Sequence, residues 1–174
     1  MKAPQILLSL AAGFLAALPA LAADAAKVPG KVEVIFAKVP DKYVDVRDSF
    51  SPTEKGQAAN LDGLKQYLEQ RGNELVPDGQ KLTVTLTEVD LAGDFEPWRD
   101  PAMHDVRIVK DIYPPRIDLE FKLTGADGKV IKEGKRELRD LAFLMKLSIR
   151  RDDPFRHEKE LLNDWLTREL KPAK

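Results

Sequence analysis

The sequence predicts an α+β protein, a two-layer sandwich in which a mixed, mostly antiparallel five-stranded sheet carries two or three helices on one face. Three segments lead to this prediction: an alternating strand at 116–123, a leucine-striped helix after residue 51, and an amphipathic helix near the C-terminus. The strand has apolar residues on one side and charged residues on the other, as expected of a half-solvated sheet. Covering the charged side with a second helix layer would bury ions without partners, so we expect helices on the apolar face only.

The start of the 174-residue chain predicts a secretory signal peptide over residues 1–22. A positive start, an apolar run too short to span a bilayer comfortably, and small residues at the cleavage site are typical of such signals. Cleavage is expected after Ala22 or Ala23. Residues 23–31 are then a flexible leader, and residues 32–171 form a single α+β domain. These features predict a periplasmic protein with no membrane anchor once the signal is removed.

Composition narrows the class of function. The chain has 28 lysine and arginine residues and 29 aspartate and glutamate residues. Removing the signal takes away one lysine, so 28 − 1 = 27 basic residues remain and the net charge is about −2. Such a balance gives no bias toward nucleic acid, which we do not expect as a partner. Because there is no cysteine, neither a disulfide nor a lipid anchor is available, and a hydrophobic core must stabilise the fold.

The first half of the domain is predicted to contain a strand, a helix and a second strand. Val32–Phe36 is rich in β-branched residues and is the first strand. The helix begins at a capping box, residues 51–54, with Ser51 as the N-cap, and ends near Gly72. Lys81–Asp90 is the second strand, which a right-handed crossover would place parallel to the first.

The second half is predicted to contain three more strands, at 105–112, 116–123 and 129–138. The prolines at 114–115 turn the chain sharply after the third strand, because neither can donate a hydrogen bond to a ladder. A glycine-rich turn at 125–128 joins the last two strands. We therefore expect an antiparallel meander.

The C-terminal part is predicted to be helical. Residues 141–149 form either a short apolar helix or a turn-rich segment. Asp153 before Pro154 marks the start of the last helix, because aspartate is a good cap and proline is favoured at the first helical position. Trp165 shares helical spacing with Leu161, which places it in the core.

Three segments of the chain resemble a known family. They are VDLAG at 89–93, the strand of Arg107 with YPPRI at 113–117, and the stretch 158–165. With these motifs, and over nearly the whole mature chain, the sequence resembles a group of small exported bacterial proteins defined as the domain of unknown function 3016. The resemblance implies an exported protein of Gram-negative type without an assigned activity. It supplies no catalytic residues to carry over.

The candidate binding surface is the loop after residue 90 with the strands that follow it. It combines acidic, aromatic and arginine side chains, and its residues are Asp90, Asp94, Glu96, Trp98, His104, Arg107 and Arg116. The acidic side chains offer oxygen ligands to a divalent cation, but their spacing matches no known calcium loop, and we favour a solvated loop without metal. Trp98 is either an interface anchor or a plug that folds back over the end of the core, and we slightly favour the plug.

The two arginines of this surface are expected on neighbouring antiparallel strands. Together with Arg136 or Lys122, Arg107 and Arg116 would recognise an anion, since guanidinium groups pair bidentately with carboxylate or phosphate. The alternative, which we favour, is pairing with acidic side chains on adjacent strands.

No pattern in the chain predicts a catalytic group. It contains no Gly-x-Ser-x-Gly motif, no cysteine and no glycine-rich phosphate loop, and His104 and His157 lack zinc-site spacing. We expect no cofactor and predict a non-catalytic binding or envelope-interaction module, with an envelope protein or a small anionic ligand as its partner. The alternatives are a metal-assisted hydrolase that uses the acidic loop 90–105, and a structural component of an envelope complex.

Overall fold

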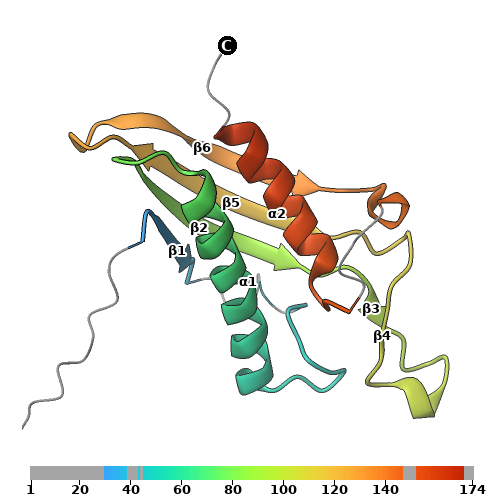
Figure 1. Ribbon diagram of the computed structural model, residues 1–174. Helices are drawn as coiled ribbons and strands as arrows, with labels where there is room; N and C mark the ends of the chain where they lie inside the picture. Colours follow the sequence, from blue (N-terminus) through green and yellow to red (C-terminus); the bar gives the residue numbers. More distant parts are fainter. Residues whose placement is uncertain (1–29, 39–42, 44, 147–151, 171–174) are drawn as a thin grey trace, which may run out of the picture.

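The computed structural model describes residues 30–38, 43, 45–146 and 152–170, so the predicted signal peptide lies outside the described residues. Two helices lie across the same face of one twisted sheet (Figure 1), which confirms the predicted α+β fold. The elements in chain order are β1 (Val32–Phe36), α1 (Glu54–Leu75), β2 (Lys81–Asp90), β3 (Asp94–Phe95), η2 (Pro101–Met103), β4 (Arg107–Ile108), β5 (Arg116–Thr124), β6 (Val130–Arg139), η3 (Phe143–Met145) and α2 (Arg156–Glu169). None of the described helices is long and apolar enough to cross a membrane.

The main sheet has four strands in the order β1-β2-β5-β6, rather than the five predicted. β1 runs parallel to β2, as expected, and the other neighbours are antiparallel. The segment 105–112 contributes only the two residues of β4, which pairs with β3 in a separate small sheet. The main sheet loses this strand because the chain leaves it at Gly93, whose N–H donates to Tyr113 O at 3.0 Å.

The two faces of the main sheet differ as the alternation predicted. Apolar side chains of β2 and β5 are buried on the helix side, among them Leu82, Val84, Leu86, Ile117, Leu119 and Phe121. On the other side, Glu120 and Lys122 are exposed and lie opposite Thr85 and Thr83. No helix of the described chain covers this open face (Figure 1).

Arg136 is an exception to the simple division of charge between the faces. Its register partner is Leu119, so it lies on the helix side, where its guanidinium pairs with Glu169 of α2 at 2.9 Å. The guanidinium also lies 5.0 Å from the ring centroid of Phe121. Arg116 and Lys122 project from the opposite, open face, so Arg136 is not part of the predicted anion patch. The alternative patch with Lys122 stays a prediction.

Both helices start at other residues than predicted, because nearby aspartates accept hydrogen bonds at the helix starts. Thr53, not Ser51, caps α1: its hydroxyl accepts from the Gly56 N–H at 2.9 Å, and Asp48 accepts from both the hydroxyl and the N–H of Thr53. The helix ends where the Val76 N–H donates to Gly72 O. α2 begins at Arg156, and Asp153 accepts from the two backbone N–H groups just before and at its start.

The C-terminal elements complete the core. Trp165 is only 2% exposed and packs edge-on against Phe121, with ring centroids 5.7 Å apart, as its helical spacing predicted. In the segment 141–149, the described residues form only the short η3 turn, which fits the turn-rich alternative. Leu141 is 78% exposed at the start of this turn, and Ile149 lies outside the described residues.

Candidate ligand-binding site

A cavity of about 320 Å³ lies where β2 ends and β5 begins, beside the β3–β4 hairpin. Three aspartates line it, Asp45, Asp90 and Asp94, together with the arginines Arg116 and Arg139. The remaining lining is largely apolar and includes Ile112, Pro114, Pro115 and Leu141. Of the predicted site residues, the cavity therefore brings together Asp90, Asp94 and Arg116. The mixture of both charges with an apolar border is typical of small-molecule sites.

The sheet register sets the charged row at this cavity. Asp90 of β2 is paired with Arg116 of β5, which in turn is paired with Arg139 of β6. Directly paired residues project from the same side of a sheet, so the three side chains form a row across the end of the open face. Arg116 already has acidic partners: it forms an ion pair with Glu88, and its Nε lies 4.0 Å from Asp90. The ion pair of Arg139 is a looser one, 3.8 Å from Glu137 on its own strand.

Arg107 does not line the cavity, but its hydrogen bonds fix the position of Asp45, which does. Its two terminal nitrogens donate to the Asp45 carboxylate at 3.1 and 3.3 Å, to Asp45 O at 2.7 Å and to Gly93 O at 2.6 Å. The Leu91 N–H donates to the same carboxylate at 2.8 Å. This set of bonds fixes the position of the Asp45 side chain at the cavity wall. The cross-strand pairing that we favoured for Arg107 is thus replaced by pairing with a loop residue.

Asp90 is the most perturbed acid of the cavity. Its pKa is raised to about 6, first by burial and then by the negative charge and hydrogen bond of Asp45, while Arg107 acts in the opposite direction. The negative charge of Asp45 disfavours the ionised form of Asp90, so Asp90 keeps its proton to a higher pH than an ordinary aspartate. A cation entering the cavity would relieve this repulsion.

Asp94 is held at the cavity edge by a cation of its own. Its Oδ1 accepts from Arg47 Nη2 at 2.8 Å and from the Phe95 N–H at 2.7 Å. The buried Phe95 ring lies between two guanidinium groups, 4.9 Å from that of Arg47 and 4.8 Å from that of Arg107. These cation–π contacts fix the start of the hairpin against the cavity.

The loop between β2 and β3 is tied to the last helix. Gly93 has φ +82°, and a Cβ there would lie 2.7 Å from Ile108 O, which explains the glycine. The Ala92 N–H donates at 2.6 Å to Glu158 of α2, a carboxyl that is only 1% exposed. Burial raises the pKa of Glu158 to about 7. α2 therefore positions the loop that forms one wall of the cavity.

The other predicted residues lie on the hairpin outside the cavity. Glu96 is buried, pairs with Lys110, and accepts from Tyr113 Oη at 3.2 Å; the hydrogen bond of Lys110 lowers the pKa of Glu96. His104 pairs with Asp105 at 2.8 Å. Trp98 is 73% exposed, so the favoured plug is wrong, and its role as an interface anchor stays a prediction.

Residues 30–168 match a family described as proteins of unknown function, DUF3016. The chain belongs to this family. The match confirms the resemblance seen in the sequence, and it covers the whole set of cavity residues from Asp45 to Leu141. A comparison with curated proteins gives no match. In this DUF3016 member the site must therefore be interpreted from its own chemistry.

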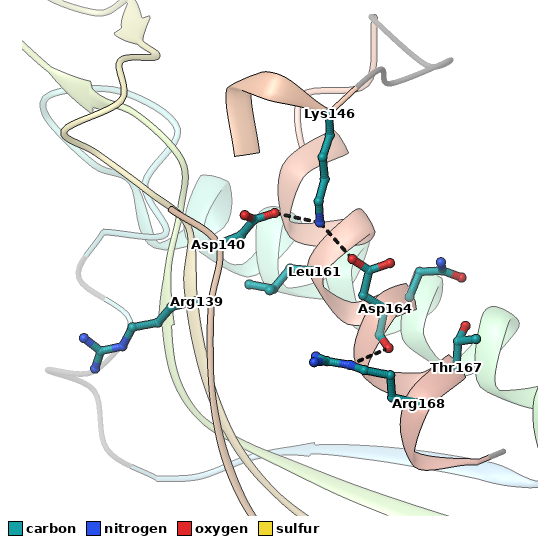
Figure 2. A pocket seen from close by; sticks show the side chains of 8 residues that line it. Arg139, Asp140, Lys146, Leu161, Asp164, Thr167 and Arg168 are labelled. Carbon is teal, nitrogen blue, oxygen red and sulfur yellow. Dashed lines mark hydrogen bonds and ion pairs between the residues drawn. The ribbon is translucent and has the colours of Figure 1, made fainter. Parts of the chain in front are cut away.

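A second cavity, of about 410 Å³, lies between α2 and the chain from the end of β6 to Lys146 (Figure 2). Three of its charged groups satisfy one another, since Lys146 pairs with Asp140 at 2.7 Å and with Asp164 at 2.8 Å. Arg139 lines this cavity as well as the first one. Arg168 Nε donates to Asp164 O at 3.2 Å. Lys146 is also the last described residue before the undescribed stretch 147–151. We therefore regard the first cavity as the candidate site.

Two charged cavity residues were missed by sequence reasoning, and they differ in how they could have been found. Arg139 follows from the hairpin, since the turn at 125–128 fixes the register that sets Arg139 opposite Arg116. Asp45 has no such signal, because only the tertiary fold brings it to Arg107, 62 positions away in the chain. Among the described residues no group of three or more histidines, aspartates or glutamates is placed to hold a metal ion.

Proposed function

We propose that this protein is a non-catalytic binding module of the periplasm and that the cavity at the end of β2 holds a small ligand. The predicted signal peptide supports the location, and the preorganised charges of the cavity support binding. The ligand carries an anionic group that contacts Arg139, as the sequence-based expectation of a small anionic ligand suggested.

One observation carries this proposal. Arg116 and Arg139 lie directly opposite each other on antiparallel strands, an arrangement that is unfavourable for like charges. Glu88 compensates the charge of Arg116. Among the described residues, Arg139 has only the loose, exposed ion pair with Glu137, of the kind that contributes little to stability. Its guanidinium therefore has donors to offer to an incoming carboxylate or phosphate.

The test is an NMR titration of ¹⁵N-labelled protein, purified from the periplasm, with a library of small anions, amines and zwitterions. We expect amide shifts to concentrate at residues 90–94, 112–116 and 139–141, and to disappear in the double variant Asp94→Asn/Arg139→Gln. A Lys122→Gln variant, changed on the same open face but away from the cavity, should retain them. Shifts confined to the β3–β4 hairpin, or no shifts with any compound, would contradict the proposal.

The other two functions weighed from the sequence gain no support from a specific observation. A metal-assisted hydrolase requires ligands that converge. In the described structure, Asp94 and Glu96 pair instead with Arg47 and Lys110, and Asp100 accepts from a neighbouring backbone N–H. A permanent component of an envelope complex would run as a large species in size exclusion of native extracts, whereas the binding module should run near its monomer mass.

A further inference from the structure

The two ends of the cavity carry opposite charge. Asp45, Asp90 and Asp94 lie toward β2, and Arg139 lies on β6 beyond Arg116. Neighbouring strands lie about 4.8 Å apart, so the backbones of Asp90 and Arg139 are separated by about 10 Å. A ligand that used both ends would need an anion and a cation held several ångströms apart.

The acidic end lacks one positive charge. Arg107 pairs with Asp45 and Arg47 pairs with Asp94. The ion pair of Asp90 with Arg116 Nε is long, 4.0 Å, and the Arg116 side chain also pairs with Glu88. Burial, and then the negative charge of Asp45, raise the pKa of Asp90. An ammonium group offers three donors, enough to reach two carboxylates at once.

The space between the charged ends has an apolar border. Ile112 is 65% exposed and Leu141 is 78% exposed, and both line the cavity together with the two prolines of the corner. Side chains of this kind at the mouth of a polar cavity favour a ligand with an aliphatic segment, whose burial they would share.

We infer that the ligand is a small zwitterion, with an ammonium group at Asp90 and Asp94, a carboxylate at Arg139, and a short aliphatic spacer over Ile112 and Leu141. This inference rests on the proposed function, which requires only that the cavity bind a small ligand with an anionic group. Free ω-amino acids and short peptides both have this chemistry.

The test compares three probes of equal length by calorimetry and NMR: 6-aminohexanoate, hexanoate and hexylamine, with the dipeptide Ala-Leu as a fourth. We expect 6-aminohexanoate to bind about ten-fold more tightly than either singly charged probe, as expected for the loss of one charge-assisted hydrogen bond. Tighter binding of Ala-Leu would assign the ligand to peptides, and tighter binding of 6-aminohexanoate to free ω-amino acids; both support the zwitterion.

Matched variants separate the two ends of the site. Arg139→Gln should weaken 6-aminohexanoate to the level of hexylamine and leave hexylamine unchanged, whereas Asp94→Asn should weaken both amines and leave hexanoate unchanged. If hexanoate binds in the cavity as tightly as 6-aminohexanoate, the zwitterion is wrong and the proposed function stands. If no probe and no compound of the library shifts the cavity amides, the proposed function fails as well.

Discussion

The buried carboxyl of Glu158 makes the stability of this protein depend on pH in a defined direction. Its pKa is about 7 in the folded protein, against an ordinary value of 4.5. Between these two values the folded state binds one proton more than the unfolded state, so the free energy of unfolding falls as pH rises through this window. At about 1.4 kcal/mol per pH unit, the loss from this group amounts to about 3 kcal/mol.

Glu158→Gln removes this dependence. The glutamine keeps an oxygen for the Ala92 N–H but places an NH₂ group where Glu158 Oε2 has no hydrogen-bond partner among the described residues. We expect a penalty of about 1 kcal/mol at every pH from that group. The variant should therefore be less stable than the parent by about 1 kcal/mol at pH 4 and more stable by about 2 kcal/mol at pH 8.5.

Urea unfolding at both pH values, followed by circular dichroism, measures the difference. Asp90 and His157 also have shifted pKa values, but both remain in the variant, so their contributions cancel. Glu160→Gln, a partly exposed glutamate of the same helix, is the control and should follow the parent at each pH. Parallel stability curves for the parent and Glu158→Gln would refute the reasoning.

Three further substitutions test the site and its hairpin by urea unfolding. Arg107→Ala should destabilise the fold by about 2–4 kcal/mol, because it leaves a half-buried carboxylate without its cation; Arg99→Ala, at an exposed position, should change stability by less than about 0.5 kcal/mol. Trp98→Ala should also change it by less than about 0.5 kcal/mol, and a loss of about 3 kcal/mol or more would restore the plug. Gly93→Ala should cost about 2 kcal/mol or more, through its positive φ and its contact with a backbone oxygen. Gly79→Ala has a similar φ, but its added Cβ would meet only Ala126 Cβ, at an ordinary contact distance of 3.6 Å, and it should cost only about 1 kcal/mol.

Local sequence patterns were sufficient to predict the two layers of the fold. The alternation at 116–123 and the helical spacing of Trp165 each follow from a period that a single segment carries, and both are borne out. The prediction that 105–112 is a strand of the main sheet was wrong, because strand pairing depends on residues distant in the sequence. Asp45 binds Arg107, and β4 pairs with β3 instead. The predicted N-cap of α1, Ser51, was wrong for a similar reason: Thr53 is the cap, and its hydroxyl donates a hydrogen bond to Asp48.

The candidate site was predictable only in part. Asp90 and Arg116 stand at the ends of regular strands, so their meeting follows from the register of β2 and β5. His104 and Trp98 share the loop with them in sequence but lie on the hairpin outside the cavity lining, because the loop folds into its own small sheet. Composition identified the right segment, and tertiary structure decided which of its side chains face the cavity.

A ¹³C NMR titration of the Asp90 carboxyl, with and without 6-aminohexanoate, tests most directly that this cavity receives a ligand cation. The pKa of Asp90 is about 6 without ligand, and an ammonium group at the carboxylate favours its ionised form. By linkage, the pKa should fall when the probe binds, and the affinity for the probe should rise as pH increases through 6. A pKa that stays at its ligand-free value with saturating 6-aminohexanoate would contradict the account.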